Sequence, residues 1–325
     1  MLCDHPRSEG SSNNAAPAVC HGSIGRLFVL LALLLSLVGG STMVASATTI
    51  TFTAEELIGN PTDTSITINI VPGSAIEYYY EYDVDQGAPY AHKTGNVTAV
   101  AGQPSEVTIT DLAPNTRYYY RMVYDGDGDV DDGDSVVRTE HSFITARAPG
   151  SSFVFAVTSD DHNARNSFTQ QAMQNIKSDQ SDFLIDLGDT FYVDNATQQS
   201  TVNTNYLSYR APMIFGAIGQ SIPIFISSGN HENEEGWNLD DTPFSIGVAS
   251  IQARKAFYPT PIDQGPGGFY SGNTDPLARI DETVYGDEFR EDYYAWEWGD
   301  ALFVVIDPFQ YTMNLPYTSG TAGEG

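Results

Sequence analysis

Three short apolar runs, each followed within three residues by a polar side chain that can bind a metal ion, constrain the fold of this chain most. The runs cover residues 153–158, 182–186 and 222–227. They are rich in β-branched and aromatic residues and have the length of buried strands. The segments 166–177 and 204–219 between them are expected helices, the second kinked or shortened by a proline. Alternating strands and helices predict a mainly parallel sheet with helices outside it.

The polar residues directly after the three runs carry the candidate chemistry. Asp160 and His162 follow the first run, Asp189 follows the second, and Asn230 and His231 follow the third. Sites in open α/β sheets form at the carboxyl ends of strands, and a carboxylate and an imidazole two residues apart can bind one cation. The third segment, taken alone, also fits a polar turn. Three such strand ends in succession favour a metal site.

These segments resemble known motifs. The D-x-H of residues 160–162, the G-D of 188–189 and the G-N-H-E of 229–232 are similar to the first three motifs of the calcineurin-like metallophosphoesterases, in order and in position after strands. The resemblance covers roughly residues 152–325. It implies an α/β fold, a four-layer α/β/β/α sandwich of which this chain contains a part.

The same resemblance implies two divalent or trivalent metal ions, such as Fe, Mn or Zn, and a small phosphoester substrate. It assigns Asp160 and His162 to the first ion, Asp189 to a bridge between the ions, and Asn230 to the second ion. Asn230 and His231 are the implied catalytic residues, with His231 contacting the phosphoryl group or protonating the leaving group. The implied reaction is hydrolysis of phosphomonoesters or phosphodiesters by attack of a metal-bridging hydroxide.

The chain departs from the family pattern in its histidines. The family has a later lone His and then a G-H-x-H, which complete both metal sites. This chain has six His, at positions 5, 21, 92, 141, 162 and 231, and none follows His231. We therefore interpret the sequence as partial. Tyr192 lies three residues after Asp189, as in the G-D-x-x-Y of purple acid phosphatases, where the Tyr binds iron. Because His162 already occupies a ligand position, we expect Tyr192 to pack beside the ligands, with metal binding as the alternative.

Residues 1–47 have the pattern of a signal peptide. An apolar core spans residues 27–38, and Ala45-Ser46-Ala47 is a small-x-small cleavage site. The alternative, a transmembrane anchor, needs about 20 apolar residues, more than this run contains. Both cysteines, Cys3 and Cys20, lie in this segment. We expect a secreted or periplasmic protein without a stable membrane anchor, and without disulfides once the segment is removed.

Residues 48–148 are expected to form an all-β domain. Strand patterns occur at 64–71, which alternates like a half-buried strand, and at 77–82, 106–110 and 141–146. The segment 112–121 resembles the turn and strand of fibronectin type III domains, with Tyr118 placed like the Tyr of a tyrosine corner. A domain of this kind precedes the catalytic domain in purple acid phosphatases. A short linker then leads to the expected catalytic domain, 151–325.

The net charge of −28 and the pI near 4.2 argue against a nucleic-acid partner, because binding to phosphates needs a basic surface.

Aspartates are concentrated at residues 125–134. A calcium loop is one interpretation, but the EF-hand pattern D-x-D-x-D-G does not occur there. We favour an acidic, solvated hairpin loop. His92 and His141 lack partners at ligand spacing and are expected to be ordinary strand or surface residues.

The last part of the chain offers fewer signals. Residues 233–292 form a long polar segment rich in Gly and Pro, which suggests a lid over the site. Within it, Arg254 or Lys255 is either a phosphate contact or, more simply, a solvated surface charge. The apolar segments flanking Gly299-Asp300 predict a hairpin. The alternative function, favoured by the missing histidines, is an extracellular binding or adhesion protein whose phosphoesterase scaffold is not catalytic.

Overall fold

The computed structural model describes residues 49–233, 244–261, 268–271, 279–282 and 286–307. These residues belong to one compact unit. The expected signal peptide, 1–47, and both cysteines lie outside the described residues. Within the described ranges, no helix has the length and apolar character needed to cross a membrane.

The N-terminal region is a sandwich of two antiparallel sheets. One sheet has the order β1-β2-β6, with β1 at Phe52–Gly59, β2 at Ile66–Pro72 and β6 at Ser105–Ile109. The other is centred on β3 (Ile76–Asp83) and β7 (Arg117–Asp125), which pair with β4 (His92–Lys93), β5 (Val97–Ala99), β8 (Val136–Val137) and β9 (His141–Ile144).

Aromatic and aliphatic side chains from both sheets fill the sandwich core. At its edge the hydroxyl of Tyr118 accepts a hydrogen bond from the backbone N–H of Ala113 at 2.9 Å. This is the tyrosine corner that the sequence predicts, and the predicted fibronectin type III-like architecture is confirmed. The half-buried state predicted for residues 64–71 is wrong, because β2 is buried along its whole length. Its second face packs on the α/β region, where Asn69 binds the carbonyl of Ala256.

The α/β region begins with a parallel sheet of order β10-β11-β12, formed by Phe155–Thr158, Phe183–Asp186 and Ile224–Ile226. Its helices are α1 (Ser167–Ser178), α2 (Gln199–Tyr209), the short α3 (Asn230–Asn233), α4 (Ile246–Phe257) and a 3-10 turn, η1 (Phe215–Ala217). Asn166 caps α1 by accepting from the backbone N–H groups of Phe168 and Thr169, as its predicted start requires.

Side chains alternate across the parallel sheet and define its two covered faces. Leu184, Ile224 and Ile226 pack in the cluster that contains the helices, whereas Phe183 and Phe225 face a second sheet. That sheet has the order β13-β16-β17, from Tyr270–Ser271, Tyr294–Trp298 and Ala301–Val305. A separate hairpin pairs β14 (Arg279–Glu282) with β15 (Gly286–Phe289).

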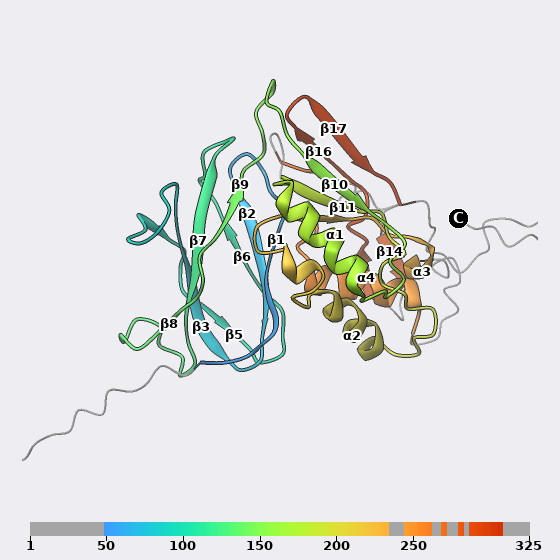
Figure 1. The fold of residues 1–325 in the computed structure, drawn as a ribbon. Helices are drawn as coiled ribbons and strands as arrows, with labels where there is room; N and C mark the ends of the chain where they lie inside the picture. Colours follow the sequence, from blue (N-terminus) through green and yellow to red (C-terminus); the bar gives the residue numbers. More distant parts are fainter. Residues whose placement is uncertain (1–48, 234–243, 262–267, 272–278, 283–285, 308–325) are drawn as a thin grey trace, which may run out of the picture. The chain divides into compact units, whose positions relative to one another are not determined.

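The succession of helices, parallel sheet and second sheet is visible in Figure 1, with α1 beside β10 and β11 and the β16–β17 pair beyond them. The Phe183 ring lies 5.1 Å from that of Trp298 and 5.8 Å from that of Trp296, so the two sheets share an aromatic core. The predicted hairpin at Gly299-Asp300 is present, with Gly299 at φ +60°. The predicted fold class, a β-sandwich followed by part of a metallophosphoesterase sandwich, is confirmed.

Three local predictions are wrong. The second helix covers Gln199–Tyr209 instead of 204–219, because it ends ahead of Pro212, where the helical conformation is disfavoured. The supposed lid at 233–292 contains α4, which is buried against α2, and other parts of that segment lie outside the described residues. The run 153–158 is not fully buried, since Phe155 and Val157 are exposed on the edge strand β10.

The sandwich and the α/β region are joined by buried polar contacts. Arg210, at the end of α2, is buried and donates to the Asn69 side chain and to the carbonyls of Asn69, Glu55 and Phe257. The backbone N–H of Ile58 also donates to the carbonyl of Gly219 at 2.7 Å. The proposed domains, 48–148 and 151–325, therefore meet over a bonded interface, and their boundaries stay a prediction.

We expect Arg210→Ala to lower the free energy of unfolding by about 3 kcal/mol, because it leaves several buried acceptors without donors. Chemical denaturation followed by tryptophan fluorescence measures this loss. Arg117→Ala is the matched control, since the Arg117 side chain is exposed and donates to the Ser142 hydroxyl at 3.2 Å. Equal stability of the two variants would contradict a stabilising role for the Arg210 contacts.

Candidate metal centre

Backbone hydrogen bonds hold together the first two predicted motifs. The N–H of Asp160 donates to the carbonyl of Gly188 at 3.1 Å, and the N–H of His162 donates to the carbonyl of Asp189 at 2.9 Å. Because β10 and β11 are parallel and adjacent, the segments after them emerge at the same edge of the sheet. The predicted residues of these two motifs are therefore neighbours.

Two glycines allow the second and third motifs to approach closely. A Cβ atom on Gly188, which has φ +93°, would lie 2.1 Å from the backbone N of Gly229. A Cβ atom on Gly229 would lie 2.1 Å from Oδ1 of Asp189. That same oxygen accepts the backbone N–H of His231 at 3.0 Å. No side chain fits between these segments, so glycine is required at both positions.

Glu232, the last residue of the G-N-H-E motif, connects the second and third motifs through buried hydrogen bonds. It is 2% exposed and accepts the backbone N–H groups of Gly229, Asp189 and Phe191 at 2.9, 3.0 and 2.7 Å. Burial raises the pKa of the Glu232 carboxyl, and these three hydrogen bonds act in the opposite direction. The sequence assigns Glu232 no role, and the structure makes it the residue that fixes the spacing of the loops.

His162, Asp189 and His231 form the centre of the site. Each offers one ligand atom, and these atoms all lie within 4.8 Å of one another. The Nε2 atom of His162 is 3.9 Å from Oδ2 of Asp189 and 3.9 Å from Oδ1 of Asp160. Asp160 is the most exposed of these side chains, and Asn230 begins α3 beside His231.

The remaining predicted residue, Tyr192, stands beside the two imidazoles. Its ring centroid is 4.5 Å from that of His231 and 5.8 Å from that of His162. This places Tyr192 against the cluster, where the sequence expects it to pack. Its role, like those of the other predicted site residues, stays a proposal.

The cluster suits a metal ion by its donors and by its backbone. Two imidazoles and a carboxylate are the ligand types that bind Zn, Fe and Mn in proteins. Asp160, His162 and Asp189 all have positive φ, at 57°, 47° and 55°, a conformation that costs non-glycine residues energy and concentrates at functional sites. The residues therefore fit a divalent metal ion.

The fold agrees with the comparisons with known proteins. Residues 153–302 match the family model described as calcineurin-like phosphoesterase. This segment is a calcineurin-like phosphoesterase domain. No curated protein matches the chain. Among solved structures, PhoD matches with a TM-score of 0.55 and 19% identity, over 81% of this chain and 53% of that one.

Two further solved structures are more distant from the chain. Purple acid phosphatase PPD1 from yellow lupin (Lupinus luteus) seeds has a TM-score of 0.47 and 16% identity, over 66% of this chain and 42% of its own. The fibronectin type-III domain of human fibronectin type III domain containing protein 3 has a TM-score of 0.23 and 16% identity, over 35% of this chain and 98% of its own. The chain thus spans about half the length of the PhoD structure.

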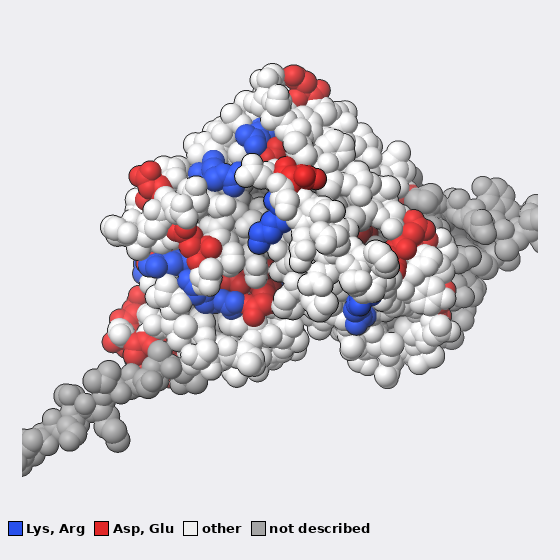
Figure 2. Space-filling view, viewed as in Figure 1, with Lys and Arg blue, Asp and Glu red and all other residues white. Residues whose placement is uncertain are grey.

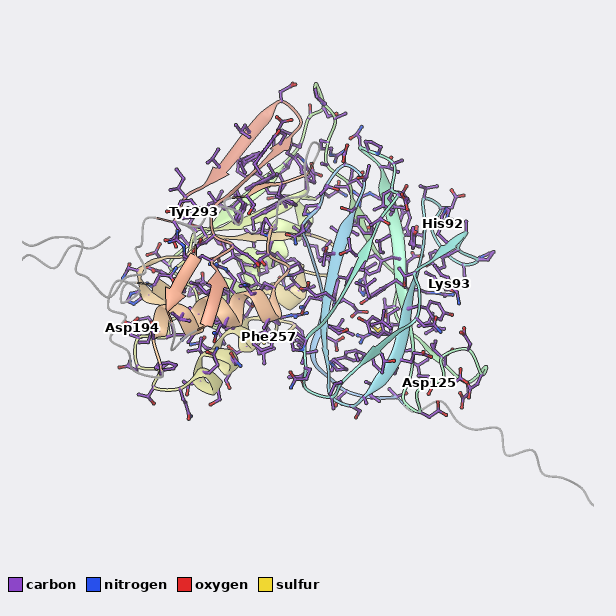
Figure 3. All side chains as sticks on the ribbon, turned by 180° about the vertical axis from the view of Figure 1, so that it is seen from behind. His92, Lys93, Asp125, Asp194, Phe257 and Tyr293 are labelled. Carbon is purple, nitrogen blue, oxygen red and sulfur yellow. The ribbon has the colours of Figure 1, made fainter. Side chains whose placement is uncertain are left out.

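Asp194 is a residue of the phosphoesterase domain that the sequence does not single out. Its carboxylate oxygens lie 2.9 and 2.8 Å from Nδ1 of His231, and Figure 3 labels it in the α/β region. Burial alone would lower the pKa of His231, but the hydrogen bond and the charge of Asp194, with that of Asp189, outweigh it and raise the pKa. In the sequence, the only sign of this role for Asp194 is its position five residues after Asp189, in the same loop.

Asp186 supports the turn of the phosphoesterase domain that carries Asp189. Its carboxylate accepts from the hydroxyls of Thr158 and Thr190 at 3.2 and 2.9 Å and from the N–H of Gly188 at 3.1 Å. Burial raises the pKa of Asp186 to about 7. The sequence presents it only as a strand residue, because nothing local shows that its carboxylate turns inward to the following loop.

Arg254 is not the solvated surface charge that the sequence favours. It is 2% exposed, and its Nη1 donates to the hydroxyl of Ser228 at 2.6 Å, just before Gly229. Arg254 therefore holds the start of the third motif of the phosphoesterase domain by a buried hydrogen bond. Lys255 pairs with Glu291 at 3.4 Å.

The aspartate-rich segment of the sandwich lies apart from this site. Ligand atoms of Asp125, Asp132 and Asp134 are within 4.8 Å of one another, and Figure 3 shows Asp125 in the sandwich region and Asp194 in the α/β region. Asp125 is 3% exposed and accepts the N–H of Asp127, so the loop is less solvated at its start than expected. His92 stacks on Tyr82.

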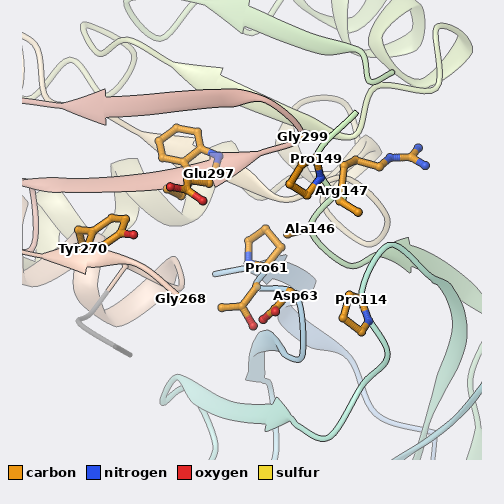
Figure 4. Close-up of a pocket in the computed structure, with 13 residues that line it drawn as sticks. Pro61, Asp63, Pro114, Ala146, Arg147, Pro149, Gly268, Tyr270, Glu297 and Gly299 are labelled. Atoms are coloured by element: carbon orange, nitrogen blue, oxygen red, sulfur yellow. The ribbon is translucent and has the colours of Figure 1, made fainter. Parts of the chain in front are cut away.

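A cavity of about 200 Å³ lies at the linker (Figure 4). Its lining comes from sandwich loops, the linker and the second sheet, and includes Pro61, Pro114, Arg147, Pro149 and Glu297. None of the predicted site residues lines it. The cavity is therefore separate from the candidate metal centre.

Proposed function

We propose that the chain is an exported, metal-dependent phosphoesterase that hydrolyses phosphomonoesters or phosphodiesters. The observation that carries the proposal is the convergence of His162, Asp189 and His231 at the ends of parallel strands, inside a calcineurin-like phosphoesterase domain. In this proposal Asp160, His162, Asp189 and Asn230 hold two ions of the Fe, Mn or Zn type. Ions of this kind supply a water of lowered pKa and offset the charge of the phosphoryl group when bound.

The residues of the chain itself position and protonate the substrate. Asp194 accepts a hydrogen bond at Nδ1 of His231, which leaves Nε2 free to carry the second proton. A raised pKa keeps more of the imidazole protonated near neutral pH. His231 can therefore donate a proton to the oxygen of the leaving group. Glu232 and Gly229 hold His231 in register with Asp189.

We expect Asp194→Asn to move the alkaline limit of activity to lower pH. Asp194 raises the pKa of His231, so its loss makes the imidazole give up its proton at a lower pH. The protonated donor then disappears as pH rises through this lower value. A pH profile of kcat/KM measures the shift, and Asp179→Asn, at the exposed end of α1, is the control. An unchanged profile would contradict the proposed pairing.

In this proposal, the N-terminal segment directs export, and the charge of the chain disfavours a nucleic-acid partner. The segment 1–47 would direct the protein out of the cell, so N-terminal sequencing of the exported product should begin at Thr48. Lys and Arg lie mainly over the sandwich on the face in Figure 2 and are interspersed with Asp and Glu. A small phosphoester is the proposed substrate, and the absence of nucleic-acid binding stays a prediction.

The proposal is tested by metal content and turnover together. Metal would be measured by mass spectrometry after dialysis, and turnover on p-nitrophenyl phosphate and bis(p-nitrophenyl) phosphate. Both are measured on this chain, on its Asp189→Asn variant, and on a chain extended through the downstream reading frame. Bound metal and turnover that both fall in Asp189→Asn support a phosphoesterase. If neither this chain nor the extended chain binds metal or turns over substrate, the alternative, a binding protein with a non-catalytic scaffold, would be favoured.

A further inference from the structure

A groove of about 430 Å³ lies between α2 and the loop that joins β10 to α1. We call it the α2 groove. None of the described residues that line it is acidic, although the chain contains 42 Asp and Glu and only 14 Lys and Arg. All of its lining side chains are polar, among them Arg165, Gln198, Ser200, Thr201, Thr204 and Asn205. A groove whose single charge is a cation attracts an anionic ligand.

Arg165 provides the charge of the α2 groove. Its side chain is exposed, and its guanidinium lies 5.5 Å from the centroid of the Tyr209 ring. Burial raises the pKa of Asp161, and the charge of Arg165 acts in the opposite direction. Within the described ranges, however, Arg165 forms no ion pair with Asp161 or with another acidic residue. The donors of the guanidinium are therefore available to an anion such as phosphate.

The uncharged groups of the α2 groove suit a ligand that carries hydroxyl groups. Ser200 and Thr201 lie in the first turn of α2 and are exposed, and Gln198 precedes the helix without capping it. No hydrogen bond to another described residue engages these three side chains. The Thr204 hydroxyl donates to the carbonyl of Ser200 at 2.8 Å, so its oxygen can still accept. Hydroxyl and amide groups of this kind both donate to and accept from a hydroxylated ligand.

The α2 groove adjoins the candidate metal centre. Arg165 follows His162 by three residues, so their Cα atoms are at most about 11 Å apart. On the other wall, Asn205 donates to the carbonyl of Tyr192 at 2.6 Å. The Tyr192 ring centroid is in turn 4.5 Å from that of His231. One small molecule can therefore reach the ligand cluster and the groove together.

The geometry points to a subsite for the substrate: we propose that the α2 groove binds the part of the substrate beyond the scissile phosphate, and that Arg165 binds a second phosphate there. The substrate class is then a small hydroxylated molecule with two phosphate groups. A guanidinium binds phosphate through two parallel N–H···O bonds, and a monophosphate that occupies only the metal centre leaves this contact unused. The inference rests on the proposed phosphoesterase function and specifies its substrate.

A pair of ligands that differ by one phosphate tests the subsite. Glucose 1,6-bisphosphate and glucose 1-phosphate are compared as competitive inhibitors of p-nitrophenyl phosphate hydrolysis. We expect the bisphosphate to have a Ki about tenfold lower, the scale of one exposed charge-assisted hydrogen bond. Arg165→Gln should remove this difference and leave turnover of p-nitrophenyl phosphate unchanged, whereas Arg165→Lys should keep part of it. Lys177→Gln, which removes an exposed charge at the other end of α1, is the control.

A binding measurement separates the failure of this inference from failure of the proposed function. Isothermal titration calorimetry measures binding of the bisphosphate to the metal-free protein and to its Arg165→Gln variant. Turnover of p-nitrophenyl phosphate with equal Ki values for the two glucose phosphates would overturn the subsite and leave the phosphoesterase proposal intact. Bisphosphate binding that depends on Arg165 in a protein without turnover would support the ligand class and contradict the phosphoesterase function.

Thr201→Glu tests the α2 groove independently of Arg165. Thr201 is exposed in the first turn of α2, where an acidic residue is favourable for the helix. The added carboxylate should raise the Ki of the bisphosphate by about fivefold, the effect of a like charge about 4 Å away in water. Gln171→Glu, at an exposed position of α1, adds the same charge outside the groove and is the control. Equal Ki values for these two variants would overturn the placement of the second phosphate.

Discussion

Replacing Gly229 by Ala should abolish metal retention at the proposed centre and reduce turnover by about 100-fold or more, the scale of loss that follows a 1 Å misplacement of reacting groups. The added Cβ would lie 2.1 Å from Oδ1 of Asp189 and 2.5 Å from its backbone N. The backbone N moves only with its loop, and Oδ1, although it ends the Asp189 side chain, is held by the N–H of His231. The loop carrying Asp189 must therefore move away from the loop carrying His231.

The matched control for this prediction is Gly95→Ala. No heavy atom lies within 4 Å of the Cβ position at Gly95, so the same methyl group meets no obstacle there. Metal content after dialysis and turnover on an aryl phosphate are measured for both variants, with circular dichroism to confirm that each is folded. A folded Gly229→Ala protein with full metal and full turnover would show that the close approach of the two loops is not needed.

The sequence predicts that these candidate residues lie at one edge of the sheet, because parallel strands and their carboxyl ends obey local rules. Each run is short, and a candidate ligand follows it within three residues, so parallel pairing of the three strands brings His162, Asp189 and His231 to one edge of the sheet. The tyrosine corner at Tyr118 is predictable for a similar reason, since its partner, Ala113, is five residues away.

Residues that act across long sequence separations could not be predicted in this way. Glu232 binds backbone groups more than forty residues earlier, and the choice between a surface carboxylate and this buried role leaves no local trace. Arg254 is similar, because its partner, Ser228, is brought near only by α4. Burial also depends on what packs on a strand. The sandwich core covers one face of β2 and the α/β region covers the other, whereas β10 and β17 are exposed at sheet edges.

Replacing His231 by Gln should lower kcat by about 10²- to 10⁴-fold, the usual contribution of a positioned general acid, while the metal content stays unchanged. The proposal makes His231 a proton donor, and Gln keeps a polar side chain of similar length but cannot supply that proton. The loss should depend on the leaving group. It should be large for phenyl phosphate, whose leaving oxygen needs a proton, and small for p-nitrophenyl phosphate, which leaves as a stable anion.

This dependence separates the two roles open to His231 in the geometry. Its ligand atom lies within 4.8 Å of those of His162 and Asp189, as a ligand's would, whereas its hydrogen bond to Asp194 suits a proton donor. If His231 binds the metal, His231→Gln should contain less metal, and its turnover of both substrates should fall by the same factor. His92→Gln, in the sandwich, is the control for the loss of an imidazole elsewhere. A uniform loss with reduced metal content would reassign His231 to the ligand set and leave Asp194 as the residue that orients it.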